Sequence, residues 1–415
     1  MATIEPEVRS TLLRQRYVDV REHTEDLAAP LTPEDQMVQS MPDVSPTKWH
    51  RGHTTWFFET FVLPLENSDY CAFHPAFGYI FNSYYETIGS RQPRDQRGVI
   101  SRPSVGEVAD YRAHVDKAMA ELFDSGPSDQ TLALVELGLN HEQQHQELLL
   151  MDIKHVLSCN PLTPEYRTCD ERHDAVSNRL GWAEHEGGTV EIGHAGSGFG
   201  FDNEFPRHRA IVTPFALADR VVTCGEWIEF IEDGGYRRPE LWLSDGWATV
   251  NQQRWDSPLY WSDDDGQWQV YTLFGSRAVV PSEPVCHVSY YEADAYAHWT
   301  GLRLPTENEW ELIASGVPFE AVGSSHLHPM PGDEVLGDLY GEVWQWTVSA
   351  YSPYPGFRAA AGAVGEYNGK FMVNQQVLRG GACATPDGHT RATYRNFFHP
   401  ASRWAFSGLR LARDN

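Results

Sequence analysis

The feature that most limits what this chain can be is a pair of histidines four residues apart in a stretch with helical periodicity. The stretch, residues 139–148, reads LNHEQQHQEL and holds His141 and His145 at positions i and i+4. Side chains with this spacing lie one above the other on the same face of a helix, so both imidazoles can reach one metal ion. The pair therefore predicts a metal site on a helix.

A zinc-hydrolase site is the second interpretation of the same stretch. His141, Glu142 and His145 match the H-E-x-x-H pattern of zinc peptidases, in which the glutamate is the general base. Glu165 follows at a distance that suits a third zinc ligand, but two prolines just before it interrupt the helix that such a ligand needs. A third interpretation is an exposed helix whose histidines bind nothing.

A further metal ligand is expected upstream, in residues 45–59, which read SPTKWHRGHTTWFFE. Ser45 and Pro46 are typical of a helix start, with an N-cap followed by proline at the first helical position. His53 then lies on this helix, and two helices of one bundle can present three histidines inward. His50 lies near the same face and competes with His53 for the role. For either residue the alternative is a histidine packed within an aromatic helix interface.

Length and charge limit the class of protein. The chain has 415 residues, which is enough for two or three domains, and its 32 Lys and Arg against 58 Asp and Glu give a formal charge of −26. This charge argues against nucleic acid and anionic membranes as partners and favours small molecules. Six cysteines without a C-x-x-C pair suit a reducing compartment. With an acidic N-terminus and no long apolar run, the sequence predicts a cytoplasmic protein.

The pattern of apolar residues divides the chain into two domains. Four helices are predicted in the first domain, residues 1–160, over 8–28, 46–63, 104–123 and 129–157, and four such helices indicate a bundle with metal ligands in its core. Residues 161–187 are predicted to be a linker. Residues 188–415 are rich in Gly, Trp and short β-like runs, with helices predicted over 290–300 and 306–314. The predicted fold class is α+β.

Seven motifs of the second domain resemble, in order, those of the formylglycine-generating-enzyme fold, which is C-type-lectin-like. The motifs are residues 188–193, 202–208, 222–227, 284–289, 303–311, 341–347 and 378–381. Formylglycine generators carry a reactive cysteine pair after the last motif. Here Thr385 and His389 stand where that pair is expected, so the resemblance does not extend to their activity.

The order of a DinB-like bundle followed by this domain resembles the ergothioneine sulfoxide synthases, the EgtB family. The resemblance implies that His53, His141 and His145 are the three ligands of a non-haem Fe(II). It also implies that the enzyme uses O2 to join a thiol to the imidazole of hercynine, Nα-trimethylhistidine, and leaves a sulfoxide. Three histidines leave three positions of an octahedral Fe(II) open, enough for an imidazole, a thiolate and O2.

The resemblance also suggests residues that bind hercynine. Gln144, beside a predicted ligand, could hydrogen-bond the imidazole, or it could be a solvated helix residue. Asn396, Phe397 and Phe398 lie in residues 394–400, the stretch that cups the trimethylammonium group in the family, and aromatic faces suit this cation. In members that use γ-glutamylcysteine an acidic residue is expected where Phe398 stands.

The loop of residues 81–94 is predicted to fold over the metal. Its tyrosines, Tyr84 and Tyr85, resemble those of the cysteine-using branch of the family, where this loop supplies the active-site phenol. Tyr84 is favoured as the proton donor, and two loop-anchoring aromatics are the alternative. Arg91 and Arg94 are candidates for binding a carboxylate, because a guanidinium pairs with it through two hydrogen bonds. Arg97 fits a surface arginine better.

The sequence therefore predicts a non-haem Fe(II), O2-dependent sulfoxide synthase that uses cysteine and hercynine and gives hercynylcysteine sulfoxide. The alternatives are a zinc metallohydrolase on His141, Glu142 and His145, a synthase of the same family with a selenium donor, and a lectin-like binding module with a degenerate bundle. The sequence leaves open whether histidine replaces hercynine, and which oligomer forms.

Overall fold

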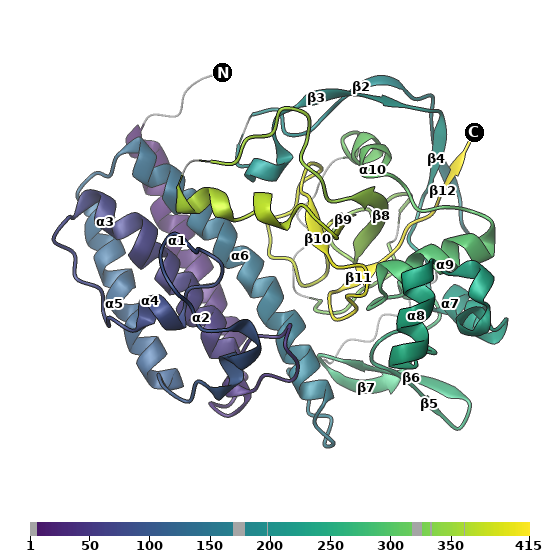
Figure 1. The fold of residues 1–415 in the computed structure, drawn as a ribbon, viewed down its shortest axis with the longest axis horizontal. Helices are drawn as coiled ribbons and strands as arrows, with labels where there is room; N and C mark the ends of the chain where they lie inside the picture. The colour runs from purple at the N-terminus through teal and green to yellow at the C-terminus, as the bar shows by residue number, and fades with distance from the viewer. Residues whose placement is uncertain (1–5, 169–178, 197, 318–325, 333, 361) are drawn as a thin grey trace. The chain divides into compact units, whose positions relative to one another are not determined.

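The chain forms two compact units (Figure 1). The computed structural model describes residues 6–168, 179–196, 198–317, 326–332, 334–360 and 362–415. The N-terminal unit comprises Met1–Tyr166 with Ala361–Tyr367, and the C-terminal unit comprises Arg167–Ala360 with Asn368–Asn415. The domains predicted from the sequence are continuous segments, whereas residues 361–367 belong with the helices of the N-terminal unit.

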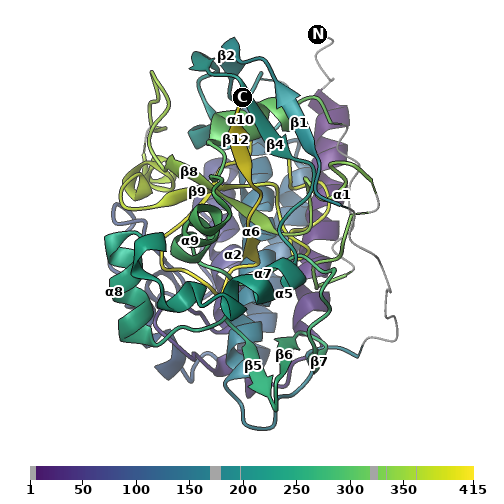
Figure 2. The ribbon, with the colours of Figure 1, turned by 90° about the vertical axis from the view of Figure 1, so that its right-hand side faces the viewer.

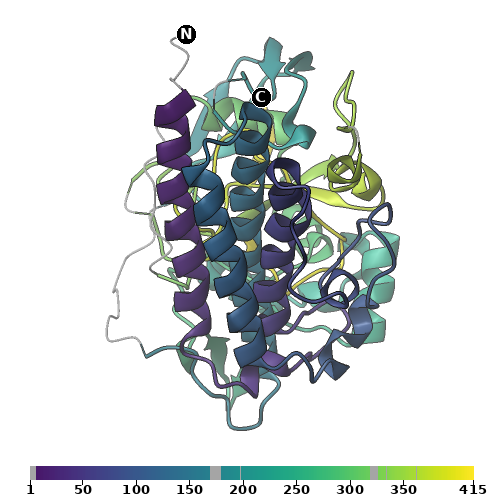
Figure 3. The same cartoon turned by 90° about the vertical axis from the view of Figure 1, so that its left-hand side faces the viewer.

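Long helices build the N-terminal unit and lie side by side in Figure 3. They are α1 (Pro6–Ala28), α2 (Thr47–Phe57), α5 (Val105–Asp124) and α6 (Asp129–Ser158). Helix α6 packs against α1 and α2, and α2 also packs against α5. The helical bundle predicted from the sequence is thus confirmed, and with the C-terminal unit described below so is the α+β class.

The connection between α2 and α5 carries several of the predicted site residues. Helix α2 continues through a π-helical turn, Phe58–Val62, into α3 (Leu63–Glu66). The connection then contains α4 (Phe77–Ile80) and a 3-10 turn, Arg94–Val99. π turns within helices are often found near functional sites, and this one follows His53 by one helical turn.

Serine side chains cap two of the helices predicted from the sequence. The Ser104 hydroxyl accepts from the backbone N–H of Glu107 while the Glu107 carboxylate accepts from that of Ser104, a capping box at α5. Ser128 caps α6. The prediction that Ser45 caps α2 was wrong: Pro46 is extended, with ψ of 142°, so the helix begins one residue later than predicted.

The C-terminal unit combines small sheets with short helices (Figure 2). In one sheet β4 (Phe215–Ala218) pairs antiparallel with β1 (Trp182–His185) and with β12 (Ala412–Asp414). Strand β1 comes from the segment predicted to be a linker. A second sheet has the order β10 (Asn396–Phe398), β9 (Gln376–Arg379), β8 (Trp344–Ala350) and β11 (Ser407–Gly408). The remaining strands are β2 (Gly188–Ile192) with β3 (His208–Val212), and β5 (Trp261–Asp264), β6 (Gln267–Thr272) and β7 (Gly275–Ala278).

Four helices accompany these strands among the described residues: α7 (Cys224–Glu232), α8 (Ser244–Gln253), α9 (Tyr290–Thr300) and α10 (Glu307–Ala314). The last two confirm the prediction. Helices α7 and α8 were not predicted. For α7 a sequence signal was present, because Thr223 and Glu226 form a capping box at its start.

Buried ion pairs hold the centre of the C-terminal unit. Arg379 of β9 is fully buried, and its Nη2 lies 2.9 Å from Glu307 Oε2 and 3.0 Å from Glu311 Oε2 on α10. Arg395 Nε lies 2.8 Å from the same Glu307 oxygen. Buried charges need such partners, because a charge left alone in a low-dielectric interior is strongly destabilising.

Candidate metal centre

Three imidazoles meet inside the N-terminal unit. His53 lies on α2, and His141 and His145 lie on α6. One ring nitrogen from each lies within 4.8 Å of the others, and the ring centroids are 4.7–4.9 Å apart. Among the described residues, this is the only group of three or more His, Cys, Asp or Glu side chains with such spacing.

Three ring nitrogens of this cluster are buried and lack hydrogen-bond partners among the described residues. His53 and His141 are 0% and 2% exposed. His53 Nδ1 donates to the carbonyl oxygen of Phe81 over 2.6 Å, and its Nε2 has no hydrogen-bond partner in the described part of the chain. Neither ring nitrogen of His141 has one there either. Buried polar atoms are nearly always paired, so three convergent imidazoles with free nitrogens fit a bound metal ion.

Electrostatics keep these rings neutral. Burial lowers the pKa of His141 to about 4. Burial, and then the neighbouring imidazole of His141, lower the pKa of His53 and of His145 well below the usual value for histidine. A metal binds the lone pair of a neutral imidazole. All three rings therefore have a lone pair available at neutral pH.

Two tryptophans fix the ring of His53. Trp49, one turn before it on α2, stacks on the imidazole at 4.6 Å between centroids and 12° between planes. Trp56, one turn after it, stacks at 5.6 Å and 17°. This is the local consequence of an aromatic stripe with helical spacing. Together with the Phe81 carbonyl, the stack leaves the ring little freedom to rotate.

His50 does not belong to the cluster. Its Nδ1 lies 2.8 Å from His145 Nδ1, and its Nε2 lies 3.0 Å from Asp152 Oδ2. Both nitrogens are therefore engaged. Of the two upstream candidates, the structure brings His53 together with the α6 pair and brings His50 against the outer nitrogen of His145.

The geometry argues against the zinc-hydrolase interpretation. Glu142 is fully buried on another face of α6, where Oε1 accepts from Thr24 and Arg112 at 2.7 and 3.0 Å and Oε2 accepts from Arg21 at 3.0 Å. Burial alone would raise the pKa of Glu142, but the two arginines hold it below its usual value. Both oxygens are occupied, so this carboxylate has none left to activate a water. Glu165 is exposed and lies outside the cluster.

The predicted tyrosines lie in the N-terminal unit with a third. The rings of Tyr84 and Tyr85 are 5.0 Å apart, and Tyr85, 2% exposed, packs on Trp56 at 5.6 Å. Tyr84 lies 5.5 Å from Tyr367. Burial, and then Tyr367, raise the pKa of Tyr84 well above that of a free phenol. The Tyr367 hydroxyl donates to Gln144 Oε1, and its ring lies 6.0 Å from that of His141.

The three arginines of the connection differ in environment. Arg91 pairs with Glu86 at 2.8 Å, and the exposed Arg94 donates to the backbone oxygen of Asp43. Arg97, predicted to be a surface residue, is instead 3% exposed. Its guanidinium lies 3.4 Å from the centroid of Trp49.

Arg97 is a buried cation without a matching anion. It donates to the hydroxyls of Ser45 and Ser83 at 2.9 and 3.2 Å. Its Nε has no hydrogen-bond partner among the described residues. Burial, and then the neighbouring Arg94, lower the pKa of Arg97 well below the usual value for arginine, while Asp152 raises it.

The remaining predicted residues lie in the C-terminal unit. Phe397 of β10 stacks on Tyr351 at 4.0 Å and 10°, so one of its faces is covered. Phe398 meets Trp404 edge to face at 5.7 Å. Asn396 is half-buried and pairs with Leu378 in the sheet.

The positions that resemble the formylglycine-generator cysteine site hold other groups. Thr385 and His389 are both buried, and His389 Nε2 lies 3.1 Å from the Tyr394 hydroxyl. Cys71, Cys159, Cys224, Cys286 and Cys383 are free thiols. The sixth cysteine, Cys169, lies outside the described residues.

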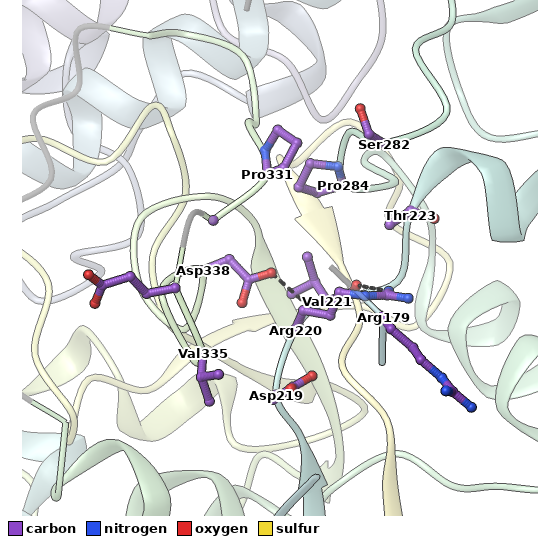
Figure 4. Close-up of a pocket in the computed structure, with 12 residues that line it drawn as sticks. Arg179, Asp219, Arg220, Val221, Thr223, Ser282, Pro284, Pro331, Val335 and Asp338 are labelled. Atoms are coloured by element: carbon purple, nitrogen blue, oxygen red, sulfur yellow. Dashed lines mark hydrogen bonds between the residues drawn. The ribbon is translucent and has the colours of Figure 1, made fainter. Parts of the chain in front are cut away.

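A cavity of about 460 Å³ in the C-terminal unit offers little chemistry (Figure 4). Several of its polar lining groups already have partners. Asp338 accepts from the backbone N–H of Val221 at 2.9 Å and pairs with Arg410 at 2.5 Å, and Arg220 pairs with Glu226 at 2.7 Å. The histidine cluster, not this cavity, is the candidate functional site.

Two residues next to the candidate metal centre were not predicted from the sequence. Asp152 lies seven residues after His145, a spacing that places both on the same helix face. Its position near His145 could therefore have been predicted from the sequence. Tyr367 lies 223 residues from its partner Gln144 in the chain and within no periodic segment. No local pattern could have found it.

Comparisons with known proteins agree with this site and fold. The Sulfatase-modifying factor enzyme 1-like domain matches residues 183–328 and 331–415, more than half of the chain, and the DinB superfamily matches residues 16–149. A hercynine oxygenase from Mycolicibacterium thermoresistibile is 30% identical over 354 residues, 78% of each chain. The chain belongs to the hercynine oxygenase family, the ergothioneine sulfoxide synthases. Members of this family are oxidoreductases.

Two more relatives define the extent of the likeness. A hercynine oxygenase from Mycolicibacterium smegmatis is 30% identical over 419 residues, covering 91% of this chain and 92% of the relative. A formylglycine-generating enzyme from Streptomyces coelicolor is 27% identical and covers 55% of this chain and 87% of its own. Within the described residues, no helix is long and apolar enough to cross a membrane.

Proposed function

We propose that this protein is an O2-dependent, non-haem iron sulfoxide synthase that joins cysteine to hercynine. The observation that carries the proposal is the cluster of His53, His141 and His145, which offers three neutral, buried imidazoles and no further protein ligand within metal-binding distance among the described residues. The reaction balances as thiol S–H plus imidazole C–H plus O2, giving the C–S(=O) product and one water. An iron ion bound there would supply the coordination positions at which the thiol, the imidazole and O2 meet.

Iron is favoured over structural zinc by the donor set. A closed zinc site uses four protein ligands, whereas three are available here. The hydrolytic alternative is disfavoured because both oxygens of Glu142 are held by Arg21, Arg112 and Thr24. Metal analysis of protein purified without oxygen tests the assignment. About one iron per chain is expected, and zinc in its stead would overturn the proposal.

We assign the proton donor to Tyr84. A phenol carries its proton at neutral pH, and burial raises the pKa of Tyr84 further. A protonated phenol can release that proton to an oxygen atom that becomes basic as O2 is reduced. Tyr85 is held by Trp56 and Phe61 at 5.6 and 5.0 Å between ring centroids, which suits a packing role.

The tyrosine assignment predicts a change of product. Tyr84→Phe should keep substrate binding but shift the product from the C–S sulfoxide towards cysteine sulfinic acid, because oxygen transfer to sulfur needs no proton at that point. Product ratios by mass spectrometry test this, with Tyr85→Phe as the matched control. If neither single variant nor the double variant changes the ratio or the rate, the proton comes from another group.

Arginines of the connection are proposed to bind the carboxylate of the thiol substrate. Arg91 and Arg94 remain candidates, but each already has an acceptor. Arg97 is the stronger candidate because it is buried and its Nε lacks a hydrogen-bond partner among the described residues. A substrate carboxylate would supply the missing anion through two parallel hydrogen bonds.

Hercynine is proposed as the acceptor. The resemblance assigns its imidazole to Gln144 and its trimethylammonium group to Asn396, Phe397 and Phe398. Cations of this kind are held by aromatic faces, and no acidic side chain stands at position 398. The relatives' name, hercynine oxygenase, supports this substrate.

The absence of an acid at position 398 and the paired tyrosines predict cysteine as the donor. Values of kcat/KM for cysteine and γ-glutamylcysteine, measured with hercynine, test the preference, and a selenium donor forms the third arm. A clear preference for γ-glutamylcysteine or for the selenium compound contradicts the choice of cysteine. Product formation without any hercynine, from histidine alone, contradicts the choice of acceptor.

A further inference from the structure

The three histidines of the metal centre differ in what holds their outer nitrogens. His53 Nδ1 donates to a backbone carbonyl, that of Phe81. His141 has no hydrogen-bond partner in the described part of the chain. His145 Nδ1 faces a second imidazole, His50 Nδ1, at 2.8 Å. His50 thus contacts the outer nitrogen of His145. The second hydrogen-bond partner of His50 decides which ring nitrogens carry protons.

That neighbour is a buried carboxylate. Asp152 Oδ2 lies 3.0 Å from His50 Nε2 and 2.8 Å from the backbone N–H of Ser45. An ionised carboxylate only accepts hydrogen bonds, so His50 Nε2 carries the proton of this contact. In a neutral imidazole the other nitrogen then has a lone pair, and His50 Nδ1 is an acceptor.

The direction of the next hydrogen bond follows. Because His50 Nδ1 accepts, His145 Nδ1 must carry the proton that bridges them. The lone pair of His145 is then on Nε2, the nitrogen left for the cluster. One carboxylate thus sets the tautomers of two imidazoles in series, from Asp152 through His50 to His145.

The local structure explains why these groups meet. His50 and His53 are three residues apart on α2, and His145 and Asp152 are seven apart on α6, so each pair shares a helix face. His50 and Asp152 are both 3% exposed. In such surroundings a hydrogen bond to a charged group is stronger than it is in water.

We propose that His50 and Asp152 are positioning residues that fix the tautomer of His145 and strengthen its donation to the metal. This inference rests on the proposed metal site. A ligand histidine that donates its outer N–H to a carboxylate or carbonyl binds its metal more tightly, and loss of such a partner typically weakens binding about 10- to 100-fold. Here the carboxylate acts through an intervening imidazole.

Three substitutions separate the components. His50→Gln keeps an acceptor towards His145 and a donor towards Asp152, while His50→Leu removes both. Asp152→Asn keeps an acceptor for Ser45 and His50 but removes the charge. Glu136→Gln is the matched control, because Glu136 lies on α6 but pairs with Arg9 at 3.1 Å and not with His50, Asp152 or the cluster.

The experiment titrates each metal-free full-length variant with Co(II) and follows both the dissociation constant and the visible Co(II) spectrum. His50→Leu should bind about 10- to 100-fold more weakly than the unmodified protein with an altered spectrum. His50→Gln should recover most of the affinity, Asp152→Asn should fall between the two, and Glu136→Gln should match the unmodified protein. Thermal unfolding without metal shows which variants fold.

Several outcomes overturn the proposal. Unchanged affinity and spectrum in His50→Leu, or equal weakness of the Gln and Leu variants, would mean that hydrogen-bond connectivity plays no part. If His50→Leu fails to fold, the comparison of Asp152→Asn with Glu136→Gln decides, and equal affinities reject the proposal. Failure of the unmodified protein to bind any metal instead rejects the metal site itself.

Discussion

Two faces of α6 bury polar side chains in opposite ways. One face carries His141 and His145, whose rings meet His53 in the cluster with unpaired nitrogens. The other carries Glu142, immediately adjacent in sequence, whose two oxygens accept three hydrogen bonds from Arg21, Arg112 and Thr24. Both regions are buried to a similar degree.

The difference separates a structural polar cluster from a functional one. A buried charge is tolerated when opposite charges and hydrogen bonds surround it, and removal of one partner then leaves another charge alone. A group of neutral imidazoles with unpaired nitrogens has no such internal balance and needs a ligand from outside the chain. The H-E-x-x-H pattern therefore belongs to two different clusters, and only its histidines belong to the candidate metal centre.

The largest expected effect is the loss of metal. His53→Ala, His141→Ala and His145→Ala should each abolish iron binding or turnover, because each removes one of three protein donors. Equilibrium dialysis against Fe(II) without oxygen measures the bound metal. His50→Ala, which removes no donor, should still bind about one iron per chain at saturation. If His50→Ala lost iron and His53→Ala kept it, the upstream ligand would be misassigned.

Next in size is the cost of disturbing the Glu142 cluster. Glu142→Gln should lower the free energy of unfolding by about 3–5 kcal/mol. Arg21 and Arg112 lose their fully buried anion and keep only the more exposed Asp116 and Glu25. Urea unfolding of the metal-free protein measures this.

Glu136→Gln is the matched control on the same helix. Its ion pair with Arg9, at 3.1 Å, is partly exposed, and such pairs contribute about 0–1 kcal/mol. A contradicting result would be that Glu142→Gln is as stable as Glu136→Gln but loses a peptide-hydrolysis activity that the unmodified protein has. That result would support the zinc-hydrolase interpretation, with Glu142 as the general base.

A third prediction uses a glutamate buried without arginines. Glu342 in the C-terminal unit accepts from the backbone N–H of Met330 at 2.6 Å, and burial raises its pKa from 4.5 to about 8. Between these values the folded protein holds a proton that the unfolded chain has released. Its contribution to stability is therefore complete below pH 4.5 and is lost as pH rises towards 8.

Glu342→Gln should remove this dependence. Relative to the unmodified protein, the variant should gain stability between about pH 5 and pH 8.5, as measured by urea unfolding at both values. Glu142, whose pKa is lowered by its arginines, should show no such loss at high pH. A parallel decline in the unmodified protein and Glu342→Gln would mean that other groups titrate in this window.

Local signals predicted the bundle well. The periodic apolar residues and the Ser104 and Ser128 caps define helices within a few residues, because helix formation depends on neighbours along the chain. The i, i+4 histidines predicted one face of the metal site for the same reason. The short strands of the C-terminal unit lack such periodicity, so resemblance rather than physical reasoning predicted that fold.

The sequence by itself determined which residues share a helix face: His141 with His145, and His50 near His53. It could not decide which of His50 and His53 joins the pair, because that depends on how α2 is rotated against α6. Tertiary packing also decided that Glu142 meets Arg21 and Arg112 and that Arg97 is buried. These contacts join groups separated by 30 to 121 residues in the chain, a distance over which no local pattern carries information.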